Sequence, residues 1–81
     1  MAKPSNTYAG NEVLVALGAA IRRKRAELGL SQETLAADAE LDRSYVGGVE
    51  RGEHNITVMS VKKITDALGM KSSELFELAG L

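Results

Sequence analysis

A short stretch near the middle of the chain carries residue types that suit contact with another molecule. If the stretch is helical, positions three and four apart share one side, and the outward side holds Arg43, Ser44, Gly47, Gly48 and Arg51. This side has a cation and a hydroxyl at its beginning and then two glycines in succession. Each glycine inside a helix costs about 0.5–1 kcal/mol relative to alanine, so the pair needs a physical reason.

Insertion into the major groove of DNA supplies one reason, because a face without side chains lets the helix backbone approach closely. Arg43 would then donate two hydrogen bonds to guanine O6 and N7, and Ser44 would reach a base edge or a phosphate. The alternative is that Gly47 and Gly48 only relieve crowding against a neighbouring helix. The outward face therefore indicates DNA contact, with crowding as the competing explanation.

Composition argues against most other chemistry. The chain has no cysteine and one histidine, which excludes a thiolate nucleophile, a disulfide and a multi-histidine metal site. No set of side chains suits catalysis, and we expect no enzyme activity, no cofactor and no small-molecule ligand. No apolar run approaches the ~20 residues of a membrane helix, and the N-terminus lacks the apolar stretch of a signal peptide. We therefore expect a cytoplasmic protein without membrane association.

The charge balance is less basic than is usual for a domain that binds nucleic acid. The 81 residues carry a net charge of −1. Attraction to phosphate is local, however, and acts over about one Debye length of ~8–10 Å. The densest basic cluster is Arg22–Arg25. It either attracts phosphate or only forms an ordinary solvated face. The acidic residues Asp66, Glu74 and Glu77 lie toward the C-terminus.

The elements that position the outward face are predicted by apolar residues recurring every three or four positions. Residues 1–10 show no such period and are expected to form a mobile tail. Residues 11–81 are expected to form one all-α domain, with helices over residues 12–28, 32–39, 43–51, 57–68 and 72–79. Expected caps are Ser31 and Asp42, and expected helix stops are Gly29, Gly52 and Gly69.

The second and third helices are separated only by Glu40, Leu41 and Asp42. So short a turn forces the two helices to cross steeply, which requires a small side chain such as Ala36 at the crossing. Val46 and the other apolar residues of the third helix then face inward. The pattern predicts a helix-turn-helix over Gln32–Arg51.

The sequence GLSQETLAADAELDRSYVGGVERGEHNITV resembles the Cro/phage-repressor (XRE) helix-turn-helix family of bacterial and phage regulators. Within that family it resembles the small controller proteins of restriction–modification systems, through LDRSYVGGVERGEHN. The similarity covers about Leu17 to Phe76. It implies a compact five-helix, lambda-repressor-like DNA-binding domain, a symmetric dimer with a C-terminal dimerisation helix, and a recognition helix beginning at Asp42 or Arg43. The chain departs from the family at Glu40, where glycine is usual, and at Lys71-Ser72.

The resemblance also implies roles for single residues. Gln32 would contact a phosphate or a base edge, Asn55 would contact the DNA backbone, and the groove-facing residues would be Arg43, Ser44 and Tyr45. Gly48 stands where relatives often carry a side chain that contacts a base. The alternatives are an ordinary solvated position for Gln32 and packing against its own helix for Tyr45.

Two opposite charges fall on faces that must meet. Arg25 lies on the apolar stripe of the first helix, and Glu50 lies on the inward side of the third. A partly buried ion pair that ties the two helices together explains both positions better than catalysis does. Relatives carry the same two residue types at these positions.

A single recognition helix contacts only a few base pairs, so we expect a homodimer that places two helices one DNA turn, ~34 Å, apart. The expected interface is the apolar surface left over on the last two helices: Met59, Met70, Leu75, Phe76, Leu78 and Leu81. The alternative is that Leu75 and Phe76 only close the core of the monomer.

These expectations combine into a sequence-specific transcription regulator that binds double-stranded DNA at a palindromic operator. Without a ligand-sensing domain, its own concentration would control its activity, as in autoregulated controllers or phage repressors. The second hypothesis is an antitoxin-type or adaptor module whose main partner is another protein.

Overall fold

The computed structural model describes residues 9–81, and this part of the chain forms five α-helices and no strand. The tail expected over residues 1–10 lies almost entirely outside the described residues. Every helix bound falls within one residue of its expected position, which confirms the all-α, five-helix fold. The helices are α1 (Glu12–Glu27), α2 (Gln32–Ala39), α3 (Arg43–Glu50), α4 (Val58–Ala67) and α5 (Ser72–Leu78).

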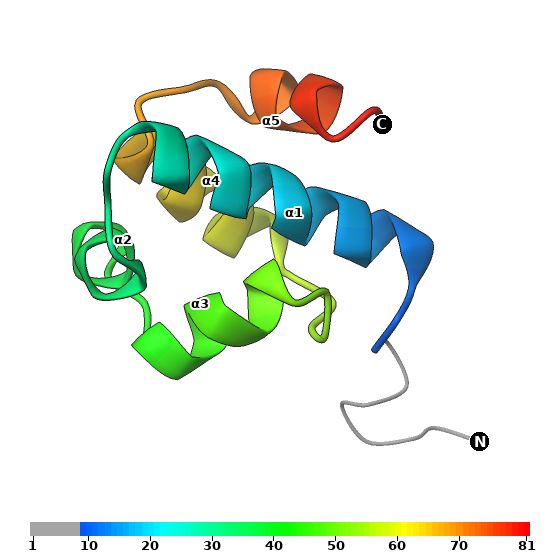
Figure 1. Cartoon of the computed structure of the whole chain (residues 1–81), viewed down its shortest axis with the longest axis horizontal. Coiled ribbons are helices and arrows are strands. Elements are labelled where there is room, and N and C mark those ends of the chain that lie inside the picture. The colour runs from blue at the N-terminus through cyan, green and yellow to red at the C-terminus, as the bar shows by residue number, and fades with distance from the viewer. Residues whose placement is uncertain (1–8) are drawn as a thin grey trace.

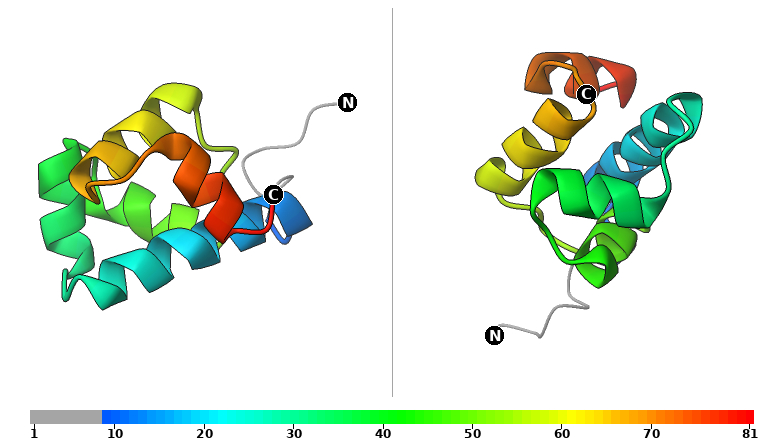
Figure 2. Two further views of the ribbon diagram at one scale, coloured as in Figure 1. Left: turned by 90° about the horizontal axis from the view of Figure 1, so that it is seen from above. Right: turned by 90° about the vertical axis from the view of Figure 1, so that its left-hand side faces the viewer.

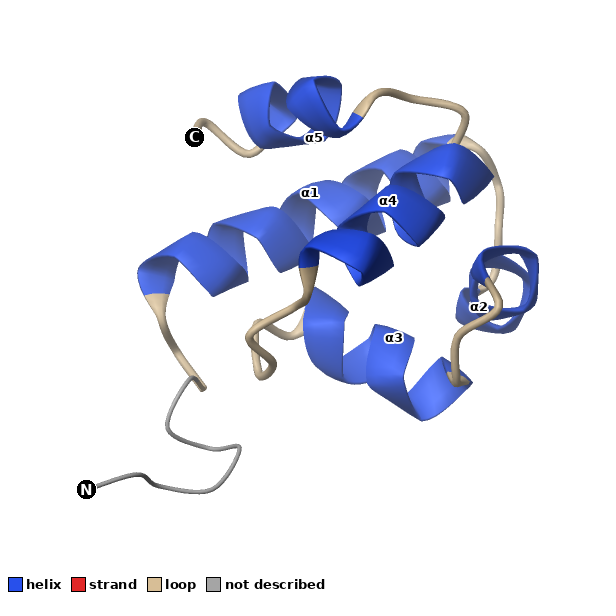
Figure 3. Cartoon of the chain, turned by 180° about the vertical axis from the view of Figure 1, so that it is seen from behind, coloured by secondary structure: helices blue, strands red, loops and turns tan. Residues whose placement is uncertain are grey.

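The five helices are arranged around α1 and α4. The C-terminal helix α5 lies on one side of these two helices, and α3 lies on the opposite side (Figures 1 and 3). Helix α2 crosses the end of the molecule at which both α1 and α4 finish (Figure 2). The helix-turn-helix and α5 are therefore presented on different sides of the molecule.

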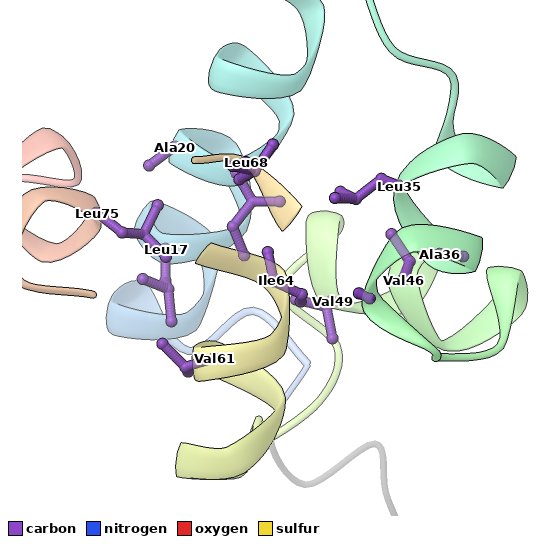
Figure 4. Close-up of a cluster of buried hydrophobic side chains, with 12 residues drawn as sticks. Leu17, Ala20, Leu35, Ala36, Val46, Val49, Val61, Ile64, Leu68 and Leu75 are labelled. Atoms are coloured by element: carbon purple, nitrogen blue, oxygen red, sulfur yellow. The ribbon is translucent and has the colours of Figure 1, made fainter. Parts of the chain in front are cut away.

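The core receives one completely buried apolar side chain from each helix. These five side chains are 0% exposed and belong to Ile21, Leu35, Val46, Ile64 and Leu75. Other buried apolar residues fill the space between them, from Leu17 and Leu68 to the small Ala36 at the crossing of α2 with α3 (Figure 4). The spacing of apolar residues in the sequence thus corresponds largely to the inner faces of the helices. An exception in α4 is Val58, whose position in the sequence predicts the same face as Val61 and Ile64 but which is 83% exposed.

The spacing of apolar residues predicts a stripe of Leu14, Leu17, Ile21 and Leu28 on the first helix, and the last of these positions is wrong. Leu28 follows the last residue of the helix, and its side chain is 46% exposed. The chain turns there through Gly29, which adopts the left-handed conformation with φ of 70°, as expected of a helix stop.

The helix caps agree with the expectation in part. Ser31 Oγ accepts a hydrogen bond of 3.0 Å from the backbone N–H of Thr34, as expected at the start of α2. Asp42 occupies the cap position of α3, but its side chain makes no capping hydrogen bond, so that expectation is wrong in detail. At the start of α5, the carboxylate of Glu74 accepts a bond of 2.7 Å from the N–H of Lys71. This bond ties Glu74, in the first turn of α5, to the cap residue Lys71, whose ammonium group cannot accept a capping bond.

Helices α1 and α3 are joined by the ion pair that the sequence predicts. Arg25 Nε donates to Glu50 Oε2 at 2.7 Å, and Arg25 Nη2 donates to Glu50 Oε1 at 3.0 Å. The third nitrogen, Nη1, donates to the carbonyl oxygen of Leu30 at 2.8 Å. The hydrogen bonds to Glu50 raise the pKa of Arg25 above its ordinary value. With side chains only 15% and 2% exposed, the pair is held largely out of water.

The backbones of α1 and α3 also approach each other closely at Gly18. A Cβ added there would overlap the carbonyl oxygen of Val49 and lie 2.7 Å from that of Glu50. Because both are backbone atoms, neither can move aside as a flexible side chain can. Glycine at this position therefore sets the separation that the Arg25–Glu50 pair spans.

We expect Gly18→Ala to lower the free energy of unfolding by about 1–3 kcal/mol, because the added methyl overpacks a backbone contact. This loss should appear although alanine is the better helix former by about 1 kcal/mol. Gly47→Ala is the matched control, because a Cβ there meets only flexible side-chain tips, that of Arg51 at 3.2 Å and that of Gln32 at 3.6 Å. Urea unfolding measures both variants. Equal stability of Gly18→Ala and the unchanged protein would contradict the close approach.

We expect Glu50→Ala to lower the free energy of unfolding by about 3 kcal/mol, because it leaves a guanidinium in a largely buried position without its partner. The control is Glu53→Ala, which removes a carboxylate from the exposed Arg51–Glu53 pair (side chains 61% and 44% exposed). Its stability should stay near that of the unchanged protein, since exposed pairs contribute little. Equal losses in the two variants, measured by urea unfolding, would show that the buried pair has no special structural role.

Candidate nucleic-acid interface

The turn between α2 and α3 depends on one residue in an unusual conformation. Glu40 ends α2 with φ of 59° and ψ of 43°, the left-handed region that costs a non-glycine residue about 1–2 kcal/mol. The N–H of the next residue, Leu41, bonds to the carbonyl oxygen of Ala36 at 2.9 Å and closes the helix end. The departure from glycine at this position therefore leaves the turn geometry intact.

The first residues of α3 are open to contact. Arg43 and Ser44 are both exposed, and they begin the helix on the side of the molecule opposite α5 (Figure 3). Their exposure matches the expectation that they face outward. Arg51, at the other end of α3, is also exposed, but its guanidinium donates to both oxygens of Glu53 at 2.9 and 3.2 Å. These bonds raise the pKa of Arg51 and lower the pKa of Glu53.

Gln32 connects the start of α2 to α3. Its Nε2 donates a hydrogen bond of 2.9 Å to Glu50 Oε1, the same oxygen that accepts from Arg25. Gln32 is half-buried, so the simple alternative of a solvated side chain is wrong. The side chain holds the first turn of α2 beside α3. The backbone N–H groups of that turn point out of the helix end, which is a geometry that suits an anion.

The two glycines do not leave the open face that the sequence suggests. Gly47 and Gly48 are both buried. The tips of Gln32 and Arg51 lie over Gly47, and the imidazole of His54 lies over Gly48. The expectation of a bare outward face is therefore wrong. Crowding against a neighbouring helix does not describe Gly48 either, because the group that covers it comes from the loop after α3.

His54 is the residue that sequence analysis missed. Its ring stacks on that of Tyr45, with centroids 5.2 Å apart and planes inclined by 24°. Tyr45 also packs partly against the core, so it is neither a fully outward residue nor one that only packs on its own helix. The exposed side chain of Asn55 follows in the same loop. The sequence feature that indicates such a residue is Gly48, because the absence of a side chain there leaves space for a group from another segment.

Some of the residues expected to form a dimer interface are exposed in the structure, and others are buried. Leu75 is completely buried in the monomer core, so its assignment to an interface is wrong. Met70 and Leu78 are half-buried against the core. The exposed members are Met59 at 64%, Phe76 at 38% and Leu81 at 54%.

The basic cluster of α1 serves more than one purpose. Arg25 is turned inward, and Arg23 Nη2 donates to the carbonyl oxygen of Leu78 at 3.3 Å. Arg23 therefore lies on the α5 side of the molecule, away from α3.

Among residues 9–81, no group of histidine and carboxylate side chains is placed to hold a metal ion, and no helix is long and apolar enough to span a bilayer.

Comparison with known proteins agrees with this geometry. A helix-turn-helix family model matches residues 21–75. Control protein C.MunI from a Mycoplasma species is 37% identical over 82% of this chain and 90% of its own length. Control protein C.BamHI from Bacillus amyloliquefaciens is 32% identical over 83% of this chain and 84% of its own length. The crystal structure of the restriction-modification controller protein C.AhdI from Aeromonas hydrophila superposes with a TM-score of 0.76 at 50% identity, covering 76% of this chain and 94% of that one. The chain therefore belongs to the XRE-type helix-turn-helix family of DNA-binding transcription regulators.

Proposed function

We propose that this chain acts as a homodimer that inserts α3 of each subunit into the major groove of a palindromic operator. The observation that carries the proposal is the exposed first turn of α3, held in place by the bonds among Gln32, Glu50 and Arg25. Such a fixed helix can present its side chains to base edges with little loss of conformational entropy on binding. The controller proteins similar to this chain suggest control of a restriction–modification system as the biological setting.

Direct base recognition falls to Arg43 and Ser44. An arginine at the start of a groove-inserted helix donates two hydrogen bonds to guanine, which discriminates against a wrong base by about 1–3 kcal/mol. The N–H groups at the start of α2, next to Gln32, suit a phosphate of the same groove. The exposed side chain of Asn55, in the loop after α3, makes a second phosphate contact.

The dimer is supported by apolar side chains that the monomer leaves in water. Val58 and Met59, in the first turn of α4, are 83% and 64% exposed, and Phe76 and Leu81 are exposed near the C-terminus. The first turn of α4 and the last turn of α5 lie toward the same end of the molecule (Figures 1 and 3). A net charge of −1 limits the attraction of one subunit for DNA, so two subunits are needed for tight binding.

The test is selection of bound duplexes from a random DNA library, carried out with the unchanged protein and with Arg43→Ala. We expect an inverted repeat whose half-sites are about one helical turn apart, and we expect Arg43→Ala to lose the preference at one base pair of each half-site. Affinity for the selected duplex should fall by about 1–3 kcal/mol per lost contact.

Lys71→Ala is the matched control, because it removes an exposed cation beside α5, on the side of the molecule opposite α3. Its base preferences should equal those of the unchanged protein. Selection of a single half-site would contradict the dimer, and unchanged preferences in Arg43→Ala would contradict the role of that residue.

A further inference from the structure

The outward side of α3 is completed by a residue that does not belong to the helix. Gly48 comes one turn after Ser44 on this side, so a side chain at position 48 would point the same way as that of Ser44. The glycine is buried because the imidazole of His54 fills the space. A Cβ at position 48 would overlap the ring, with Cδ2 only 2.6 Å away.

The imidazole is held in one orientation from two sides. Its Nε2–Cδ2 edge lies against Gly48, and its face stacks on Tyr45. In the imidazole ring Nδ1 is opposite the Nε2–Cδ2 edge, so it points away from Gly48. Within residues 9–81, neither ring nitrogen of the half-buried His54 takes part in a hydrogen bond, and neither is fully buried. The ring is therefore positioned without using its polar atoms inside the protein.

We propose that His54 is a DNA-contacting residue that takes the place of the missing side chain at position 48. The inference rests on the proposed insertion of α3 into the groove. Tyr45 and Gly48 act as positioning residues that hold the ring, and Nδ1 donates a hydrogen bond to an acceptor on the DNA. The acceptor is a base edge or a phosphate oxygen, and both offer the same chemistry to an imidazole N–H.

The local charges fit this contact. The carboxylate of Glu53, adjacent to His54, is engaged by the guanidinium of Arg51, which shields the imidazole from an unpaired neighbouring anion. His54 and the paired guanidinium of Arg51 thereby bring polar groups to the C-terminal half of α3, where the helix itself carries no polar side chain between Tyr45 and Glu50. The contact surface then extends along the whole outward side of α3.

The test measures affinity for the selected operator duplex by fluorescence anisotropy. His54→Ala removes the ring, and His54→Phe keeps a ring that can stack on Tyr45 and cover Gly48 but has no nitrogen. We expect both variants to bind on the order of 5-fold more weakly per subunit, the effect of one hydrogen bond. If His54 only supports the loop, His54→Phe will bind as tightly as the unchanged protein, which would overturn the proposal.

Gly48→Ala tests the positioning role, because its methyl must displace the imidazole. It should weaken binding as His54→Ala does, and adding it to His54→Ala should cause little further loss. Independent, additive losses would show that Gly48 and His54 do not act together. Urea unfolding of each variant separates a binding defect from a folding defect.

The acceptor is identified by two further measurements on His54→Phe. A changed base preference in the library selection assigns the contact to a base edge. A uniform loss of affinity with a shallower dependence on salt assigns it to a phosphate. Failure of the unchanged protein to bind any duplex would overturn the proposed function and this inference together. Tight binding that His54→Phe leaves unaltered would overturn this inference alone.

Discussion

The hydrogen-bonded group formed by Arg25, Glu50 and Gln32 holds together the three helices on which the rest of the structure depends. One carboxylate accepts from a guanidinium on α1 and an amide on α2, while its own backbone belongs to α3. Taking these charged groups out of water is expensive, and the group is stable only because both carboxylate oxygens of Glu50 find donors. Its geometry is specific, so it fixes how α3 sits relative to both other helices.

Two helical glycines of this protein, Gly18 and Gly48, allow other groups to approach the helix backbone closely. Gly18 lets the backbone of α3 rest directly on α1, which brings Glu50 within reach of Arg25. Gly48 lets a loop residue settle against the outward side of α3. In both cases the absence of a Cβ permits a contact. At Gly18 the contact joins two helices far apart in sequence, and at Gly48 it joins a helix to the loop that follows it. Close packing of this kind leaves α3 little freedom to tilt.

Much of the fold and part of the site follow from the sequence. The inner faces of the helices are set by apolar spacing, and Arg25 and Glu50 were identifiable as partners because two opposite charges interrupted such faces. The choice between Leu75 and Phe76 for the core was not predictable in this way. The two are adjacent on a short helix, and only the docking of α5 decides which one turns inward.

The position of His54 could not be predicted because loops have no periodicity from which to infer a neighbour. Its single occurrence argued only against a metal site. The pair of glycines gave the right location but the wrong interpretation, since the space they create is filled from within the same chain. A missing side chain on a functional face is therefore better taken as a sign of an unknown neighbour than as a sign of an open surface.

The surface that meets DNA is tested most directly by the change in backbone amide NMR shifts when the selected operator duplex is added. The proposed mode of binding predicts the largest changes at the first turn of α2, along α3 and in the loop of residues 52–56. Amides of α5 that lie away from its exposed apolar side should shift little, because α5 lies on the opposite side of α1 and α4 (Figure 3). The largest changes on α5, with α3 unaltered, would contradict recognition by the helix-turn-helix.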